Sequence, residues 1–353
     1  MSKVISVGTS VGKYAIEQSE VKCFVHELFS GNNIDIDRMI SVFDNSNVVK
    51  RHFSVPIDWF GKKHSFSERN KLFVENALEM SIKSIEDCLN IAGVKANEID
   101  HIFFISTTGL ATPSIDALLL NKFKFKNHIK RTPIWGLGCA GGAAGLSRAM
   151  EYTKAYPQKI ALVLALELCS LTFQKDDLSK SNIVASSLFS DGCAAVLVIG
   201  DENPGFIKEG INLFDSLSTT YDDSLDVMGW EIIDEGFKVI FRKDIPAIVT
   251  NLVRKNIEEI LSANSLTIND IAYYVTHPGG MKVINAYETS IGLNNGTLKH
   301  SRQILKEYGN MSSPSVLFVL KEFLEKEKYE KGKNGLISSL GPGFSSELLL
   351  FST

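Results

Sequence analysis

The chain alternates short apolar runs with longer segments in which apolar residues recur at the spacing of a helix. The first eight residues and the runs Ile102–Ile105 and Ala272–Val275 have the composition of strands, and Ile160–Leu171 is the most apolar stretch. Strands that are apolar at nearly every position are typical of sheets buried on both faces. The pattern therefore predicts an α/β fold built in layers.

The pattern also contains an internal repeat. Residues Glu86–Ile99 align without a gap with Glu258–Ile271, and in both copies a helical segment leads into a strand. The same spacing sets Cys139 almost opposite Asn310, and each stands at the start of a helical segment. We therefore expect two halves that present matching helix N-termini.

The ends of the two copies agree as well. Residues Ser190–Ile199 and Gly341–Leu350 both form a turn followed by an apolar strand. Chance explains one such match more easily than three in the same order. We predict two halves of similar topology, residues 1–203 and 204–353.

Composition narrows the class of protein. A chain of 353 residues with 44% hydrophobic and 22% charged residues is typical of a globular protein with a large core. The net charge of −4 offers no positive field for nucleic acid, and the longest apolar stretch is much shorter than the roughly twenty residues that span a bilayer. We expect neither nucleic acid nor a membrane as a partner. The five cysteines are widely and irregularly spaced, which argues against disulfides or a zinc site and favours the cytoplasm.

Cys139 is the first candidate for chemistry. It lies in Gly136-Leu-Gly-Cys-Ala-Gly-Gly142, where an apolar run gives way to a helical segment. Glycines let a substrate approach the backbone, and the N-terminus of the following helix would favour the thiolate. Such a thiol suits acyl transfer, whereas a small buried hydrophobic role is the alternative for a free cysteine.

His277 and Asn310 are the candidate polar partners. His277 ends a strand-type run, and α/β folds keep their chemistry at strand ends. Asn310 precedes a helical segment and could equally be its N-cap. An asparagine amide and an imidazole N–H can together bind a thioester oxygen or a developing enolate. The set Cys139, His277 and Asn310 therefore suits carbon–carbon bond formation from a malonyl thioester.

Four segments in this order closely resemble the signatures of the type III polyketide synthases, the chalcone and stilbene synthase superfamily: Gly136–Gly142, Thr276–Gly280, Tyr308–Ser313 and Leu340–Phe344. The resemblance implies a thiolase-like fold, in which duplicated βαβαβαββ halves form a layered αβαβα core. It also implies a homodimer that uses CoA thioesters and needs no metal or bound cofactor. In such an enzyme Cys139 is the nucleophile, while His277 and Asn310 bind the thioester carbonyl and promote decarboxylation.

The resemblance assigns further residues to the substrate. Phe189 matches the phenylalanine between the CoA tunnel and the cavity, although plain core packing is its alternative role. Val239 stands at a second gate, where its small side chain predicts an open passage. Trp230 and Cys169 replace a glycine and a threonine of the plant enzymes, as in bacterial members. The other positions assigned to substrate binding in these segments are Thr107, Gly279 and Ser312.

Two outer regions depart from the plant pattern. Thr112 matches a methionine that reaches into the partner subunit's cavity, so we expect an altered dimer contact. Arg38 aligns with one basic residue that holds the CoA phosphates, but Ser41 and Asn45 replace two others. Lys282 is a further candidate for the nucleotide end, with an ordinary solvated role as the alternative.

We therefore predict a polyketide-forming acyltransferase that loads an acyl-CoA on Cys139, extends it with malonyl-CoA and cyclises the chain to an alkylpyrone or an alkylresorcinol-type phenolic. A tetrahydroxynaphthalene synthase, which uses malonyl-CoA alone, has the same catalytic set. A β-ketoacyl-acyl-carrier-protein synthase III shares the fold. A cysteine-dependent α/β-hydrolase is disfavoured, because Leu137 stands where its motif needs glycine and Asn310 follows the histidine.

Overall fold

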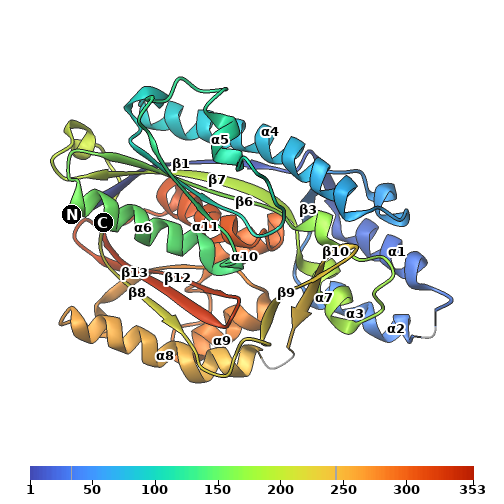
Figure 1. The fold of residues 1–353 in the computed structure, drawn as a ribbon. Helices are drawn as coiled ribbons and strands as arrows, with labels where there is room; N and C mark the ends of the chain where they lie inside the picture. The colour runs from blue at the N-terminus through green and yellow to red at the C-terminus, as the bar shows by residue number, and fades with distance from the viewer. Residues whose placement is uncertain (33, 243–244) are drawn as a thin grey trace.

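The computed structural model describes residues 1–32, 34–242 and 245–353 (Figure 1). Its main sheet has nine strands in the order β11-β12-β13-β8-β1-β7-β6-β4-β5. Their bounds are β1 (Ser2–Val11), β4 (His101–Ile105), β5 (Lys130–Ile134), β6 (Ile160–Leu168), β7 (Asp191–Gly200), β8 (Ile211–Thr220), β11 (Ile271–Thr276), β12 (Asn334–Gly341) and β13 (Ser345–Ser352).

The sheet consists of two halves that meet where β1 pairs with β8, Ser2–Val4 against Ile211–Leu213. Moving outward, the first half runs β1-β7-β6-β4 and the second runs β8-β13-β12-β11. In both halves the two outer strands of these four are parallel, and the other neighbours are antiparallel. The duplication predicted from the sequence is confirmed.

The helices form three layers around the two half-sheets (Figure 1). Helix α4 covers the outer face of the first half, α8 covers that of the second, and α6 and α11 pack against each other between them. The bounds are α1 (Gln18–Phe29), α2 (Ile36–Met39), α3 (Ser41–Asn45), α4 (Phe66–Ala92), α5 (Ile115–Leu119), α6 (Gly141–Ala155), α7 (Lys180–Leu188), α8 (Ile245–Ala263), α9 (Met281–Ile291), α10 (Lys299–Tyr308) and α11 (Ser313–Lys326). This arrangement is the predicted αβαβα core.

The halves differ in one connection. Between β4 and α6 the first half forms α5 and the strand β5, whereas between β11 and α11 the second half forms α9 and α10. The second half therefore contributes one strand fewer to the main sheet, and β5 is left at the edge of the first half.

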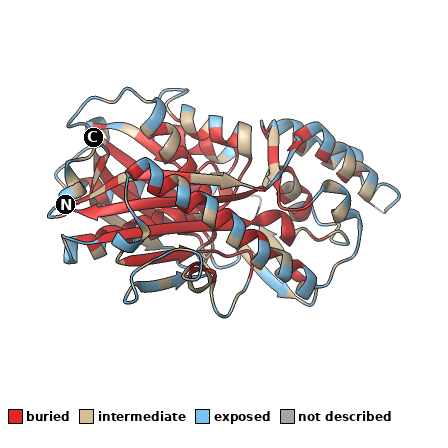
Figure 2. Ribbon diagram, turned by 90° about the horizontal axis from the view of Figure 1, so that it is seen from above, coloured by how far each residue is buried: buried red, intermediate tan, exposed pale blue. Residues whose placement is uncertain are grey.

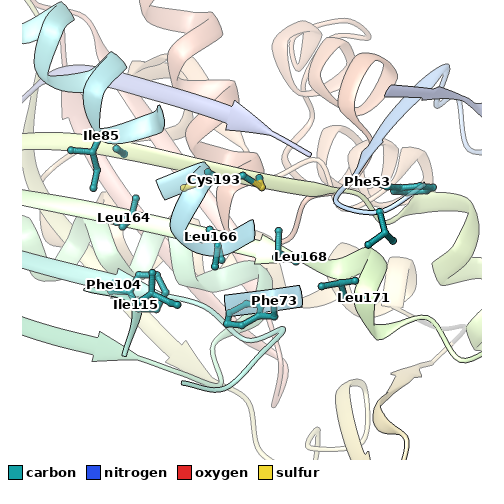
Figure 3. Packing of buried hydrophobic residues seen from close by; sticks show 14 of the residues in the cluster. Phe53, Phe73, Ile85, Phe104, Ile115, Leu164, Leu166, Leu168, Leu171 and Cys193 are labelled. Carbon is teal, nitrogen blue, oxygen red and sulfur yellow. The ribbon is translucent and has the colours of Figure 1, made fainter. Parts of the chain in front are cut away.

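The core lies on both faces of the half-sheets. Every residue of β6 and β7 is buried (Figure 2). Alternate residues Leu164, Leu166 and Leu168 of β6 lie in the cluster that includes Phe73 and Ile85 of α4 (Figure 3). Ala161, Val163 and Ala165, which alternate with them, pack instead in the cluster that contains α6 and α11. This two-sided burial explains why the strand is apolar along almost its whole length.

Two small two-stranded antiparallel sheets complete the fold at one end of the layers. They are β2 (Tyr14–Glu17) with β3 (Lys50–Phe53), and β9 (Met228–Ile233) with β10 (Gly236–Phe241). Helices α1 to α3 and α7 lie at the same end (Figure 1). Within the described residues, no helix combines the length and the apolarity needed to cross a membrane.

Candidate active site

Cys139 lies in a single turn of 3-10 helix, Gly138–Ala140, directly before α6. Gly138 has a φ of 45°, and a Cβ there would lie 2.7 Å from the ring of Pro342. A Cβ on Gly341 would lie 2.5 Å from the carbonyl oxygen of Leu137. The turn that carries the thiol and the turn after β12 thus pack so closely that both need glycine.

Asn310 follows the last residues of α10 and is held by its backbone beside Phe189. Its N–H donates to the carbonyl oxygen of Leu188 at 2.8 Å, and its own carbonyl accepts from the N–H of Ser190 at 2.9 Å. Its side-chain Oδ1 accepts from the N–H of Ser312 at 2.8 Å. Ser312, not Asn310, is the N-cap residue of α11, so the alternative role considered for Asn310 does not apply.

His277 and Asn310 converge on Gly279. The amide Nδ2 of Asn310 donates to the carbonyl oxygen of Gly279 at 3.2 Å. A Cβ on Gly279 would lie 3.7 Å from Nε2 of His277. His277 is 5% exposed, and neither of its ring nitrogens has a hydrogen-bond partner among the described residues. The imidazole is therefore buried with its hydrogen-bonding capacity unused.

The thiol of Cys139 belongs to the same cluster, since the side chains of Ser312 and Asn310 act on its pKa by hydrogen bonding. Burial nevertheless raises the pKa of Cys139 to about 11, and the negative charge of Glu167 acts in the same direction. Burial lowers the pKa of His277 to about 3. The expectation that the helix N-terminus favours the thiolate is thus outweighed by desolvation, and at neutral pH the resting pair is a thiol and a neutral imidazole.

Glu167 lies behind Cys139 and was not among the residues singled out from the sequence. It is fully buried, and its Oε2 accepts hydrogen bonds from the N–H of Thr107 and the hydroxyl of Thr108, both at 2.8 Å. Its Oε1 accepts from the hydroxyl of Ser313 at 2.9 Å. Burial raises the pKa of this carboxyl to about 7. The sequence feature that could have identified Glu167 is a single carboxylate in the otherwise apolar β6.

Thr107 also contacts the turn of Cys139 directly. Its hydroxyl oxygen accepts a hydrogen bond from the N–H of Gly138 at 3.0 Å. Glu167 and Thr107 thereby connect β6, the end of β4 and the nucleophile turn. This network fixes the thiol relative to α11.

An apolar cavity of about 50 Å³ adjoins Phe189. Three residues predicted to contact substrate, Cys169, Phe189 and Val239, line it. Its other lining residues are Val21, Phe24, Val25, Arg51, Phe53, Ile57, Phe60, Ser170, Thr172, Phe173, Asn182, Ala185 and Ser186. Cys139, His277 and Asn310 do not line it, and Phe189, whose backbone bridges to Asn310, is the link between the two regions.

Trp230 extends the aromatic border of this region. It pairs with Val239 across the β9–β10 hairpin, and its ring centroid lies 6.2 Å from that of Phe189. Phe189 also stacks on Phe241 at 5.7 Å. The predicted gate is thus a small aromatic cluster rather than a single side chain.

The outer candidates lie apart from the cavity. Arg38 on α2, Lys282 on α9 and Thr112 are exposed, and none of them lines it. Within the described parts of the chain, no group of three histidine, cysteine or acidic side chains is arranged to hold a metal.

Comparison with known proteins identifies the family. Residues 1–203 and 214–353 match the sequence profiles described as the N-terminal and C-terminal domains of chalcone and stilbene synthases. A "Putative chalcone synthase" of Bacillus subtilis is 44% identical over 100% of this chain and 99% of its own length. A "1,3,6,8-tetrahydroxynaphthalene synthase" of Streptomyces peucetius is 32% identical over 99% of this chain and 92% of its own.

The fold agrees with solved structures. The crystal structure of 1,3,6,8-tetrahydroxynaphthalene synthase from Streptomyces coelicolor, described as a bacterial type III polyketide synthase, superposes with a TM-score of 0.94 at 28% identity and covers 99% of both chains. Enzymes of this family act on CoA thioesters and need no further cofactor. The chain therefore belongs to the chalcone and stilbene synthase family and is a bacterial-type type III polyketide synthase, a condensing acyltransferase.

Proposed function

We propose that this enzyme uses a fatty acyl-CoA as its starter, extends it with malonyl-CoA and releases an alkylpyrone or an alkylresorcinol-type phenolic. The observation that carries the proposal is the cavity behind Phe189, whose walls are mostly aliphatic and aromatic. Burial of each methylene of a saturated chain contributes about 0.8 kcal/mol. An alkyl starter therefore suits these walls better than a polar starter does.

In the proposed mechanism Cys139 carries the chain. The neutral imidazole of His277 accepts the thiol proton as the sulfur attacks the acyl-CoA thioester, and CoA leaves as its thiol. One N–H of the Asn310 amide donates to Gly279, and the other, which faces the Cys139 thiol, is proposed to bind the substrate once the sulfur carries an acyl group. This N–H and an N–H of His277 bind the thioester oxygen of malonyl-CoA. Carbon dioxide then leaves, and the resulting enolate attacks the acyl carbon on Cys139, whose carbon–sulfur bond breaks to release the Cys139 thiolate and a CoA thioester extended by two carbons.

Phe189 is proposed as the gate between the catalytic residues and the cavity. Cys169, Trp230 and Val239 shape the cavity, and Thr107, Gly279 and Ser312 hold the catalytic groups. Arg38 and Lys282 are proposed to contact the CoA phosphates. This assignment is supported by their exposure and positive charge.

We also propose that the protein is a homodimer in the cytoplasm and that each subunit consists of two halves, residues 1–203 and 204–353. The strand β5 is an unpaired edge of the main sheet, and the exposed side chains of Leu110 and Trp135 lie close to it. The indole N–H of Trp135 donates to the carbonyl of Gly109, so these two side chains belong to one surface together with Thr112. The division into halves is supported by the profile match that ends at residue 203.

The test is product analysis by mass spectrometry after incubation with malonyl-CoA and saturated acyl-CoA starters of increasing length, with Cys139→Ala as the blank. We expect kcat/KM for the starter to rise by up to about fourfold per methylene until the cavity is filled. A naphthol formed from malonyl-CoA alone, without use of any starter, would instead support the second candidate, which the 32% identical relative favours. Turnover that requires an acyl-carrier protein would contradict both.

The catalytic assignment has a separate test. Intact-protein mass spectrometry should detect an acyl group on Asn310→Ala but not on Cys139→Ala. Asn310→Ala should fail to release carbon dioxide from malonyl-CoA, because its amide is needed for the enolate. Equal loss of loading in both variants would refute this division of roles.

A further inference from the structure

Arg51 on β3 is a buried cation in the wall of the apolar cavity. It is 1% exposed and is one of the largest fully buried side chains. Its Nη1 donates to the carbonyl oxygens of Ser186 and Phe189, at 2.5 and 3.1 Å. Its Nε and Nη2 have no hydrogen-bond partner within the described residues. These two nitrogens form one edge of the guanidinium group, the edge that can donate two parallel hydrogen bonds.

The charge of Arg51 is not neutralised by a contacting carboxylate in the described structure. The nearest acidic influence is Asp191, whose oxygens are occupied by Ser170 and by the N–H of Ser54. The guanidinium carbon lies 5.2 Å from the ring centroid of Phe53 and 5.8 Å from that of Phe43. Aromatic faces stabilise a cation but accept no strong hydrogen bond, so the N–H groups of Nε and Nη2 are left without a strong acceptor among the described residues.

We propose that the Nε–Nη2 edge of Arg51 binds the keto oxygens of the growing polyketide chain. A saturated starter has no acceptor beyond its thioester, whereas each condensation adds one ketone. Arg51 would therefore discriminate between an unextended and an extended chain in the same cavity. The inference rests on the proposed function in one respect, that the chain enters this cavity.

The test measures binding without turnover in Cys139→Ala protein. The probes are pantetheine amides of dodecanoic acid and of 3-oxododecanoic acid, which differ by one ketone. A hydrogen bond to a charged donor predicts that the ketone probe binds about tenfold more tightly. Adding Arg51→Met should abolish this ratio while the dodecanoyl probe still binds. Equal affinity of the two probes in Cys139→Ala protein would overturn the proposal, as would a preference that survives Arg51→Met.

Arg69 provides a matched control. It is also a buried arginine that donates to backbone carbonyls, those of His64, Leu171 and Phe173, and its guanidinium lies 5.5 Å from the ring centroid of Trp59. It does not line the cavity. Arg69→Met should therefore keep the ketone preference even if its stability falls. Loss of the preference in both variants would indicate a structural role and count against the proposal.

A second readout comes from enzyme with Cys139 intact. Arg51→Met should release products that contain fewer malonyl units than those of the wild type. If Arg51→Met does not fold, Arg51→Lys keeps the charge and removes the two-donor edge, and it should lose most of the ketone preference. A chain made from malonyl-CoA alone also carries ketones. Rejection of fatty starters would therefore refute the proposed starter, while the ratio of the two probe affinities would still test the role of Arg51. Acceptance of fatty starters with a ratio of one would refute the role of Arg51 alone.

Discussion

At the scale of single residues, Ser312 combines an unfavourable backbone with a contact to the nucleophile. Its φ of 57° and ψ of −129° are adopted readily by glycine and cost other residues about 1–3 kcal/mol. Its side chain donates to the Cys139 thiol and thereby lowers the thiol pKa. The strain is thus coupled to the chemistry of the nucleophile.

We expect Ser312→Gly to increase the free energy of unfolding by about 1 kcal/mol and to raise the pKa of Cys139, since the strain and the hydrogen bond are both removed. Urea denaturation and the pH dependence of iodoacetamide alkylation measure the two effects. Ser312→Ala is the control, because it keeps the strain: its thiol pKa should rise without any gain in stability. If Ser312→Gly had a lower free energy of unfolding than the wild type, the backbone conformation of Ser312 would not be what destabilises the folded protein at this position.

Replacement of Glu167 should change the pKa of the same thiol in the opposite direction. Its negative charge raises the pKa of Cys139, so Glu167→Gln should lower that pKa and shift the alkylation profile toward lower pH. Asp191→Asn is the matched control, since Asp191 is also a fully buried carboxyl group but is not a cause of the thiol shift. An identical shift in both variants would mean that a general loss of packing, and not removal of the Glu167 charge, lowers the pKa of Cys139.

At the scale of elements, the close packing of two turns sets the position of the thiol. A Cβ on Gly341 would lie 2.5 Å from the Leu137 carbonyl oxygen and 2.6 Å from the Cβ of Ala140. Gly341→Ala must therefore displace the nucleophile turn, and we expect it to cost about 1–3 kcal/mol of stability and to slow acyl loading. Thermal unfolding and intact mass measure these effects.

Gly61→Ala is the control for this prediction. A Cβ on Gly61 would meet nothing closer than a ring carbon of Phe24 at 3.9 Å, so both stability and loading should be unchanged. If Gly341→Ala behaved like Gly61→Ala, the close approach of the two turns would not be what positions Cys139.

Much of this arrangement was predictable from local sequence. The apolar run of β6, the repeat that aligns α6 with α11 and the glycine-rich turns are all properties of short segments, and together with the family signatures they led to the cluster of Cys139, His277 and Asn310. The replacement of β5 by α10 in the second half was not predictable from the repeat, because the two segments differ in sequence there. Arg51 was missed because its importance comes from contacts between distant elements, which no short segment encodes. Glu167 stood out locally as a single carboxylate in an apolar strand, but its partners on distant elements were not predictable from that strand.

At the scale of the whole molecule, duplication creates the site. The helices α6 and α11 occupy equivalent positions in the two halves and pack together between the half-sheets. The first half places Cys139 at the start of α6, and the second half places Asn310 and Ser312 before α11. Neither half alone contains a complete catalytic set, so the active site is complete only when α6 and α11 pack together in the central layer.

That central layer also buries carboxyl groups, which makes global stability depend on pH. Burial raises the pKa of Glu167 from 4.5 to about 7, so between these values the folded protein binds a proton that the unfolded chain has lost. Stability from this group is therefore fully present below about pH 4.5 and declines as the pH rises toward 7. The buried His277, with its pKa lowered to about 3, acts in the opposite direction between about pH 3 and 6.5.

Comparison of the wild type with Glu167→Gln isolates the carboxyl contribution, because His277 is common to both. We expect the free energy of unfolding of the wild type, relative to the variant, to fall by up to about 3 kcal/mol between pH 4.5 and 7.5 in urea denaturation. Parallel pH profiles for the two proteins would mean that Glu167 is already ionised in the folded state at the lower pH, and that its hydrogen bonds to Thr107, Thr108 and Ser313 outweigh the cost of its burial.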